Sequence, residues 1–410
     1  MSDALPRLTT AQAAARLGVK RATLYAYVAR GLIASVRGEA GGSTFDPLEI
    51  ESFAANGSAR RARAPGQAMP GRPLMVLDWD LTLLTQDALH FRGVPAAELA
   101  RRPFEEAVTF FWSGGVPPEP LGAAETQRRP KASPDTDALL GTERSALDRL
   151  IVATVLAATQ DAHRQELERD AVLRASRGLL KRFAETLNRP ASRTAAGTIA
   201  DSLWLSIAGR APEPGDIALL NAALVLCIDH DLAASTMAAR VAASARADLY
   251  GCVIAALGAL SGTLHGSVSI AAWELIAETM RTGRPAAALS RQVAAGRGTP
   301  GFGHLVYTGE DPRATALFER MRELSHYRDV MQAVDQLRGV VRARLHRDAN
   351  VDLALAALSV GAGGTHGAAQ AVFAIGRTAG WTAHVLDEYS KRPLRLRPES
   401  RYRGVPPEST

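Results

Sequence analysis

The sequence is poor in cysteine and in aromatic residues. Its 410 residues contain two cysteines, Cys227 and Cys252, and only 5% Phe, Trp and Tyr. Both cysteines lie in apolar sequence without metal-ligand spacing, and one disulfide would be unusual in so long a chain. We therefore expect a reduced, cytoplasmic protein with no metal site. Few aromatic residues beside abundant Ala and Leu favour helices over a β-sandwich.

Long apolar runs are also missing. No stretch approaches the roughly 20 uninterrupted apolar residues of a membrane-spanning helix. The N-terminus lacks the charged and then apolar pattern of a signal peptide. These absences predict a protein that neither spans a membrane nor is secreted. With 47% hydrophobic and 22% charged residues, the chain has the composition of a soluble globular protein, and its length indicates about two or three domains.

Acidic residues are scarce at the N-terminal end. The whole chain has a net charge of +6, and residues 1–72 hold ten Lys and Arg against five Asp and Glu. Most of the excess positive charge therefore belongs to this first segment. Such a distribution is typical of a separate module with an anionic partner.

The basic segment has the pattern of a helix-turn-helix. Thr9 and Gln12 have the spacing of a capping box, which predicts a first helix over 11–17 that Gly18 ends. A second helix is expected over 20–30. Its inward face is expected to hold Leu24, Tyr25 and Val28, and its outward face Lys20, Arg21, Thr23 and Tyr27.

Residues 32–45 are expected to form a wing of two short strands around Gly41 and Gly42, followed by a third helix from Asp46. The run from Leu8 to Ile33 and the wing resemble the winged helix-turn-helix of the MerR and excisionase type. The resemblance implies that the second helix reads the major groove of DNA through Lys20, Arg21, Thr23 and Tyr27. A small helical domain that contacts protein is the alternative.

Residues 56–73 separate this module, residues 1–55, from the rest of the chain. They are rich in Arg, Gly and Pro and have no apolar periodicity, which is typical of a linker. Its arginines are either solvated linker residues or additional phosphate contacts.

From Leu74 the pattern is mainly helical. We expect a short strand or ribbon over 73–84, a turn at 90–93, a short helix over 103–113 and a loop over 116–143. The rest predicts an all-α body without internal repeats, with helices at about 144–160, 163–187, 193–209, 214–230, 231–245, 247–262, 266–281, 286–295, 312–325, 327–345, 350–361 and 366–386.

The loop from Gly301 to Arg313 combines two groups that suit one ligand. Gly301 and Gly303 allow a tight turn, so His304 projects from a loop, and a helix with Pro in its first turn carries Arg313. An imidazole can hydrogen-bond a carbonyl, and a guanidinium can bind a carboxylate through two parallel bonds. The loop therefore favours a 2-oxo acid as ligand, and a purely structural loop beside a capped helix is the alternative.

Further segments carry similar groups. His230 ends an apolar run, His265 precedes a predicted helix, and Asp352 lies in the first turn of another. Because a helix N-terminus disfavours imidazolium, His265 is expected to be neutral. Arg377 and Arg397 lie in the C-terminal part of the chain.

Taken in this order, the segments around His230, His265, His304 to Arg313, Asp352 and Arg377 resemble the citrate synthase family. The resemblance covers about residues 74–405. It implies a large helical domain, residues 74–265 and 373–405, and a smaller helical domain, residues 266–372, that closes over substrate in a homodimer or higher oligomer. In the family, an acyl-CoA condenses with a 2-oxo acid such as oxaloacetate. The CoA thioester is a substrate there, and no cofactor is implied.

The same resemblance assigns catalytic roles to His265, His304 and Asp352. Asp352 would remove the α-proton of the thioester, His265 would donate to the enol oxygen, and His304 would polarise the ketone. A weakly acidic α-proton requires this combination of a base and an oxyanion donor. The oxo-acid carboxylates would be bound by His230, Arg313, Arg377 and Arg397, the last of which reaches across the dimer.

The sequence departs from the family pattern around the CoA. Leu305 and Thr308 stand where the family has basic residues near the CoA phosphates. Ala233 replaces an asparagine, Ser267 replaces a glycine, and apolar residues follow Asp352. These changes leave the oxo-acid residues intact and put the CoA side in question.

Two functions follow. The first is condensation of acetyl-CoA or propionyl-CoA with oxaloacetate, which gives citrate or 2-methylcitrate and CoA, alone or with a homologous subunit. The second is a transcriptional regulator, in which the body senses an oxo acid or acyl-CoA while the helix-turn-helix binds DNA. The retained catalytic residues favour the enzyme, whereas Leu305, Thr308 and the basic N-terminal module favour the sensor.

Overall fold

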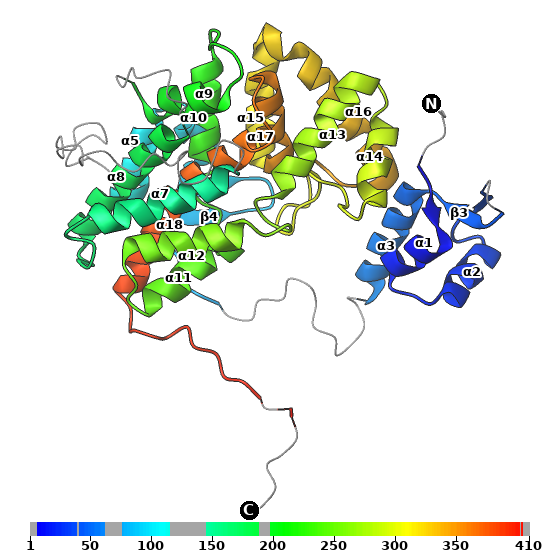
Figure 1. Ribbon diagram of the computed structural model, residues 1–410, viewed down its shortest axis with the longest axis horizontal. Coiled ribbons are helices and arrows are strands. Elements are labelled where there is room, and N and C mark those ends of the chain that lie inside the picture. Colours follow the sequence, from blue (N-terminus) through cyan, green and yellow to red (C-terminus); the bar gives the residue numbers. More distant parts are fainter. Residues whose placement is uncertain are drawn as a thin grey trace, which may run out of the picture.

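A computed structural model describes residues 6–38, 41–61, 76–114, 145–187, 197–401 and 403–404. These residues form a small N-terminal module and a larger, mainly helical body (Figure 1). The module consists of β1 (Leu8–Thr9), α1 (Thr10–Leu17), α2 (Arg21–Ala29), β2 (Val36–Arg37), β3 (Ser43–Phe45) and α3 (Pro47–Arg61).

The module is the winged helix-turn-helix that the sequence predicts. Thr9 and Gln12 form the capping box of α1, and Gly18 ends that helix in the left-handed conformation. Strands β2 and β3 form the antiparallel wing, and β1 pairs with the other edge of β3. Apolar side chains from its helices and strands enclose a separate small core that includes Leu24 and Phe45.

The third helix of the module is longer than expected. Because α3 continues to Arg61, residues 56–61 of the predicted linker are helical. The remainder of that linker, residues 62–73, lies outside the described residues, as does the loop predicted at 116–143.

The body begins with a small sheet. Its strands are β4 (Thr82–Leu84), β5 (Leu89–Phe91) and β6 (Val94–Pro95), in the order β4-β5-β6. The described helices are α4 (Ala96–Leu99), α5 (Phe104–Ser113), α7 (Ala146–Gln160), α8 (Arg169–Thr186), α9 (Ile199–Ile207), α10 (Asp216–Leu226), α11 (Ala234–Ser244), α12 (Leu249–Leu260), α13 (Val268–Thr282), α14 (Pro285–Ala294), α15 (Pro312–Glu323), η1 (Ser325–Tyr327), α16 (Arg328–Leu345), α17 (Val351–Gly361) and α18 (Ala368–Tyr389).

The mainly helical class is confirmed, and the differences from the expected elements are local. Within the described residues 76–84, the expected strand is limited to β4, and two further strands that the all-α expectation omitted complete the sheet. The helix expected over 163–187 begins at Arg169, because residues 162–165 form a turn. The helix expected over 214–230 ends at Leu226, because the chain turns there and Asp231 adopts a φ of 55°. His230 therefore lies in a turn.

Helix α18 is the centre of the body. It is buried along most of its length and contacts α7, α8, α10, α11, α12 and α17. Gly380 lets the turn after α10 lie against it, because a Cβ at this position would be 2.1 Å from the carbonyl oxygen of Ile228. One helical turn later, the His384 ring bonds Asp229 at 3.1 Å. Helix α18 thus fixes the turn that carries His230.

Helices α13 to α17 pack against one another and form the part of the body that faces the module (Figure 1). Helix α3 of the module lies against α14 and α16. This group resembles the smaller domain expected over residues 266–372, although α18 begins inside that range, at Ala368. Its closing motion stays a prediction. Among the described helices, none combines the length and the apolar character needed to cross a membrane.

The close packing of Gly380 predicts a large cost for a single methyl group. Gly380→Ala should lower the free energy of unfolding by about 3 kcal/mol, because the turn at 228–230 has to move. Urea denaturation would measure this change. Gly258→Ala is the matched control, because Gly258 lies inside α12 with nothing within 4 Å of an added Cβ, and it should stabilise the protein by about 0.5–1 kcal/mol. Equal effects would contradict the packing argument.

Candidate active site

The loop from Gly301 to Arg313 is joined to the segment that leads into α17. The amide of Gly303 donates to the carbonyl oxygen of Asp348 at 2.8 Å, and the amide of Asn350 donates to Gly301 at 2.9 Å. Gly301 and Gly303 have φ values of 83° and 86°, so the predicted tight turn is confirmed. The pairing brings the loop beside the N-terminus of the helix that carries Asp352.

Asp311 connects the two helices that begin at this point. Its buried carboxylate accepts bonds from the backbone amide, Nε and Nη2 of Arg313 at 3.0, 3.0 and 2.7 Å, and from the amide of Val351 at 3.1 Å. Burial favours the protonated acid, but the Arg313 guanidinium outweighs it and holds the pKa of Asp311 below its usual value. Two nitrogens of the Arg313 guanidinium are therefore already bonded to Asp311. The sequence analysis did not predict this pairing.

The backbone sets the tautomer of His304. Its Nδ1 atom accepts bonds from the amides of Val306 at 3.0 Å and Tyr307 at 3.3 Å. Burial, assisted by the charge of Arg313, lowers the pKa of His304 to about 4. The ring is therefore neutral at pH 7, and its proton lies on Nε2, which can donate to a ligand.

His230 lies beside His304 but has a protein partner. The two ring centroids are 5.0 Å apart, and the Nε2 atom of His230 is 2.9 Å from the hydroxyl of Tyr307. Burial and the charges of Arg313 and Arg377 hold the pKa of His230 well below its usual value. A carboxylate that binds His230 must therefore compete with Tyr307, a residue to which the sequence analysis gave no role.

His265 lies in the turn between α12 and α13. Its Nε2 atom is 2.9 Å from the hydroxyl of Ser235 on α11, and its ring meets Phe373 edge-on with centroids 5.9 Å apart. Burial and the charge of Arg377 lower the pKa of His265 to about 4. The expectation of a neutral imidazole agrees with this, but the cause is burial rather than the dipole of the following helix.

Asp352 is the second residue of α17. Asn350 caps this helix and accepts a bond from the Asp352 amide at 3.0 Å. Burial raises the pKa of Asp352 to about 7, with Asp311 acting in the same direction and the Arg313 guanidinium opposing. The residue as a whole is half-buried. A carboxylate with this pKa can accept a proton near neutral pH.

Arg377 is a buried cation that forms no ion pair with a carboxylate of the described residues. Its exposed fraction is 1%, Nε donates to the carbonyl oxygen of Cys227 at 2.8 Å, and Nη2 has no hydrogen-bond partner in the described part of the chain. Burial lowers the pKa of Arg377 to about 10, with Asp229 opposing, so the guanidinium stays charged. A buried guanidinium with an unused donor is suited to an anionic ligand.

Arg397 is separated from these residues. It is exposed, in a segment that leaves the end of α18 and extends away from the body (Figure 1). The amide of Leu394 donates to Ser244 at 2.8 Å, and the buried side chain of Leu396 further anchors the start of this segment. Of the predicted site residues in the body, Arg397 alone is not near the others, which is compatible with a role in a second subunit's site.

Comparison with known proteins identifies the family. Residues 71–399 match the model of the citrate synthase C-terminal domain. The chain belongs to the citrate synthase family. Residues 7–58 match a helix-turn-helix domain. The matched range includes His265, His304 and Asp352, the residues to which the resemblance assigned catalytic roles.

Individual relatives are distant. Citrate synthase 2 of Bacillus subtilis is 31% identical over 209 aligned residues, which are 50% of this chain and 56% of that relative. The 2-methylcitrate synthase 2 of Corynebacterium glutamicum is 26% identical over 78% of this chain and 89% of its own length. The crystal structure of citrate synthase from Thermotoga maritima is similar with a TM-score of 0.67 and 26% identity, covering 84% of this chain and 97% of that one. A ternary complex of citrate synthase from Thermoplasma acidophilum with carboxymethyl coenzyme A and oxaloacetate shares the fold at a TM-score of 0.68 and 22% identity, over 82% of this chain and 96% of that one.

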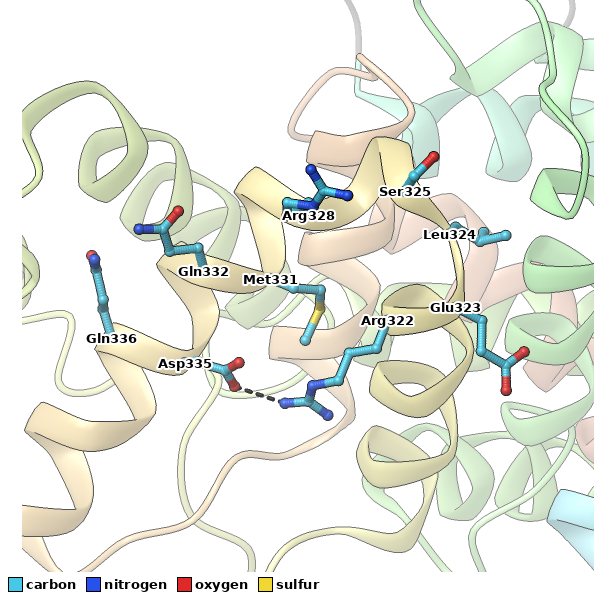
Figure 2. A pocket seen from close by; sticks show the side chains of 9 residues that line it. All are labelled: Arg322, Glu323, Leu324, Ser325, Arg328, Met331, Gln332, Asp335 and Gln336. Carbon is cyan, nitrogen blue, oxygen red and sulfur yellow. Dashed lines mark hydrogen bonds and ion pairs between the residues drawn. The ribbon is translucent and has the colours of Figure 1, made fainter.

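The structure also shows what the departures from the family do. Leu305 is 91% exposed, and Thr308 is exposed as well. Both side chains are uncharged, so neither can pair with an anionic group at this exposed part of the loop. Ala233 and Ser267 are the N-cap residues of α11 and α13, and neither side chain forms a capping hydrogen bond. A surface hollow lies elsewhere: Figure 2 shows it between α15 and α16, lined by residues that include the Arg322–Asp335 ion pair and none of the predicted site residues.

The outward face of α2 is only partly as predicted. Lys20 and Arg21 are exposed, and Thr23 is half-buried. Tyr27 was expected to face outward, but its ring packs against Phe53 of α3 with centroids 5.0 Å apart. Tyr25 was expected to face inward and is 48% exposed. The prediction exchanged the two tyrosines because Tyr27 meets a ring from α3, whose position the local sequence does not reveal.

The raised pKa of Asp352 predicts a pH-dependent stability difference. The usual pKa of the side chain is 3.8, and burial raises it to about 7 in the folded protein, so ionisation costs the folded state stability as the pH rises between these values. Asp352→Asn should therefore be more stable than wild type at pH 8, by about 2–4 kcal/mol. The difference should shrink to about 1 kcal/mol at pH 4.5. Denaturation at both pH values measures it, and a difference independent of pH would contradict the assignment.

Proposed function

We propose that the protein condenses an acyl-CoA with oxaloacetate and releases a citrate-type product and CoA. The observation that carries this proposal is the buried guanidinium of Arg377, with an unpartnered Nη2, beside a carboxyl with a pKa of about 7. A cation, a base and neutral imidazoles with pKa values of about 4 form a site for an anionic substrate with an acidic C–H bond. The Thermoplasma acidophilum complex, which contains carboxymethyl coenzyme A and oxaloacetate, supports the same pair of ligand classes.

Each group then has a defined role. Asp352 takes the α-proton of the thioester, and His265 donates a hydrogen bond to the oxygen that becomes the enolate. The α-carbon attacks the ketone of oxaloacetate, which the Nε2 proton of His304 polarises. Water then cleaves the thioester, so that CoA leaves and a new carboxylate forms.

The guanidinium groups bind the oxo-acid carboxylates. Arg377 offers its free Nη2, and Arg313 offers the part of its fork that Asp311 does not occupy. His230 joins them when Tyr307 releases its Nε2. Because both arginines are buried, water does not screen their attraction for the carboxylates.

The CoA side of the site is less polar than the resemblance to the family implied. Leu305 and Leu264 are 91% and 97% exposed, and they lie next in sequence to the catalytic residues His304 and His265. Neither leucine can pair with a phosphate. We expect acyl-CoA to be held mainly through its thioester end, with acetyl-CoA and propionyl-CoA as the two candidate substrates.

Release of CoA thiol tests the proposal. Wild type should release thiol from acetyl-CoA or propionyl-CoA only when oxaloacetate is present, with a rate that rises through about pH 7 as Asp352 ionises. Asp352→Asn should lower the rate by at least about 1,000-fold, because it removes the base and keeps the shape. Thermal denaturation at pH 8 confirms that the variant is folded. Oxaloacetate-dependent release at the wild-type rate in Asp352→Asn would contradict the role of this residue.

The position of Arg397, away from the other predicted site residues, leads us to predict a site that two subunits of a homodimer form together. If the segment after α18 completes the partner's site, Arg397→Gln and Asp352→Asn should each be inactive alone. Dimers formed by mixing the two unfolded variants and refolding them should recover about one quarter of wild-type activity, because half of the dimers contain one intact site of two. Refolded mixtures that stay inactive, while refolded wild type recovers, would show that Arg397 serves its own chain.

The N-terminal module supports a second, additional function, which is binding to DNA. Lys20 and Arg21 are exposed at the start of α2, where a recognition helix contacts DNA. Binding of duplex DNA by the full chain should weaken steeply with salt. Lys20→Ala with Arg21→Ala should weaken binding at least about tenfold. The matched control is Arg322→Ala, in an exposed ion pair on the body, and an equal loss in the control would contradict a role for α2.

A further inference from the structure

The helix-turn-helix module and the body share a packed interface. Ala294 of α14 packs against the core of the module, and Leu48 of α3 belongs to the core of the body. Two ion pairs cross the junction, between Asp46 and Arg344 at 2.7 Å and between Glu51 and Arg347 at 3.4 Å. The module is therefore docked on the body through α3.

Glu51 is the most buried charge of this junction. Its exposed fraction is 5%, and its carboxylate also accepts bonds from Nε and Nη2 of Arg16 on α1 at 2.8 and 2.5 Å. One carboxylate thus neutralises a guanidinium of the module and a guanidinium of the body. Loss of Glu51 would leave two partly buried cations close together, which is costly.

Arg347 continues from this junction to the catalytic loop. Its Nη1 atom donates to the hydroxyl of Thr299 at 2.8 Å, and its Cδ would be 3.5 Å from a Cβ at Gly303. The carbonyl oxygen of Thr299 accepts from Phe302 at 3.2 Å. Arg347 therefore bonds the first residue of the segment 299–303 and borders the space where a side chain at Gly303 would project, immediately before His304.

We infer that Arg347 is a positioning residue for His304 and that Glu51 of the module holds Arg347 in place. Arg347 does not reach the reacting atoms. Its side chain fixes the turn from which His304 projects, so the helix-turn-helix is a structural support of the active site as well as a candidate DNA-binding unit. Glu51 lies outside residues 71–399, which match the family, so this support belongs to the added module.

The inference rests on the proposed condensation, because its effect is expected in binding and polarisation of the oxo acid. His304 contacts the ketone, whereas His265 and Asp352 serve the thioester. Displacement of the 299–304 turn should therefore raise the KM for oxaloacetate, lower kcat, and leave the KM for acyl-CoA and the pH profile of Asp352 unchanged.

The test compares two arginines of the same interface. Arg347→Gln should raise the KM for oxaloacetate by about tenfold, and Arg347→Lys should restore part of the loss. Arg344→Gln is the matched control, because Arg344 pairs with Asp46 across the junction and no described contact joins it to residues 299–303; its KM should change less than about twofold. Glu51→Gln should resemble Arg347→Gln, and the double variant should be no worse than either.

The outcomes separate this inference from the proposed function. If wild type turns over and Arg347→Gln matches Arg344→Gln, the positioning role is wrong. If wild type does not turn over, the proposed function fails, and hydrogen exchange of the amides at 299–307 decides the inference instead. Faster exchange in Arg347→Gln than in Arg344→Gln would support the positioning role, and equal exchange would overturn it.

Discussion

The buried carboxylate of Asp311 is the contact on which the site depends. It binds the Arg313 side chain and the amide of Val351, and so joins the beginnings of α15 and α17. The first helix carries Arg313, the candidate carboxylate-binding guanidinium, and the second carries the candidate base Asp352. Because the connecting loop is tied to residues 348–350 on the same side, His304 is fixed relative to both. A single acidic residue therefore aligns three groups that are distant in sequence.

The electrostatics of the site follow from two buried arginines. Their charges add to burial in keeping His230 neutral, Arg313 adds to burial at His304, and Arg377 does so at His265. The same charges oppose the effect of burial on Asp352, so its pKa reaches only about 7. Neutral donors and a base near neutral pH thus arise from one arrangement. Arg313 forms an ion pair with Asp311. No described carboxylate forms an ion pair with Arg377, which is influenced only through space by Asp229 and Asp352, so an anionic substrate would complete the charge balance.

The sequence predicted best those features of the site that depend on residues close together in the chain. The glycines around His304, the helix start at Arg313 and the capped turn before Asp352 are local patterns, and the structure has each of them. The contacts of Tyr307 with His230 and of Ser235 with His265 join separate elements, so spacing along the chain contained no signal for them. The exchange of Tyr25 and Tyr27 has the same origin, because the contact of Tyr27 with Phe53 of α3 overrides a weak periodicity. The contact from Glu51 to Arg347 spans almost 300 residues and required the three-dimensional structure.

Through the inferred support of the turn before His304, the helix-turn-helix module and the body are functionally coupled. The central claim, however, concerns bond formation in the body, and carbon tracing tests it most directly. Wild-type protein supplied with acetyl-CoA labelled at the α-carbon and with oxaloacetate should yield citrate that contains the label at its new carbon–carbon bond, in equal amount to the CoA released. Labelled free acetate in place of citrate, or no labelled product with either acetyl-CoA or propionyl-CoA, would contradict the account.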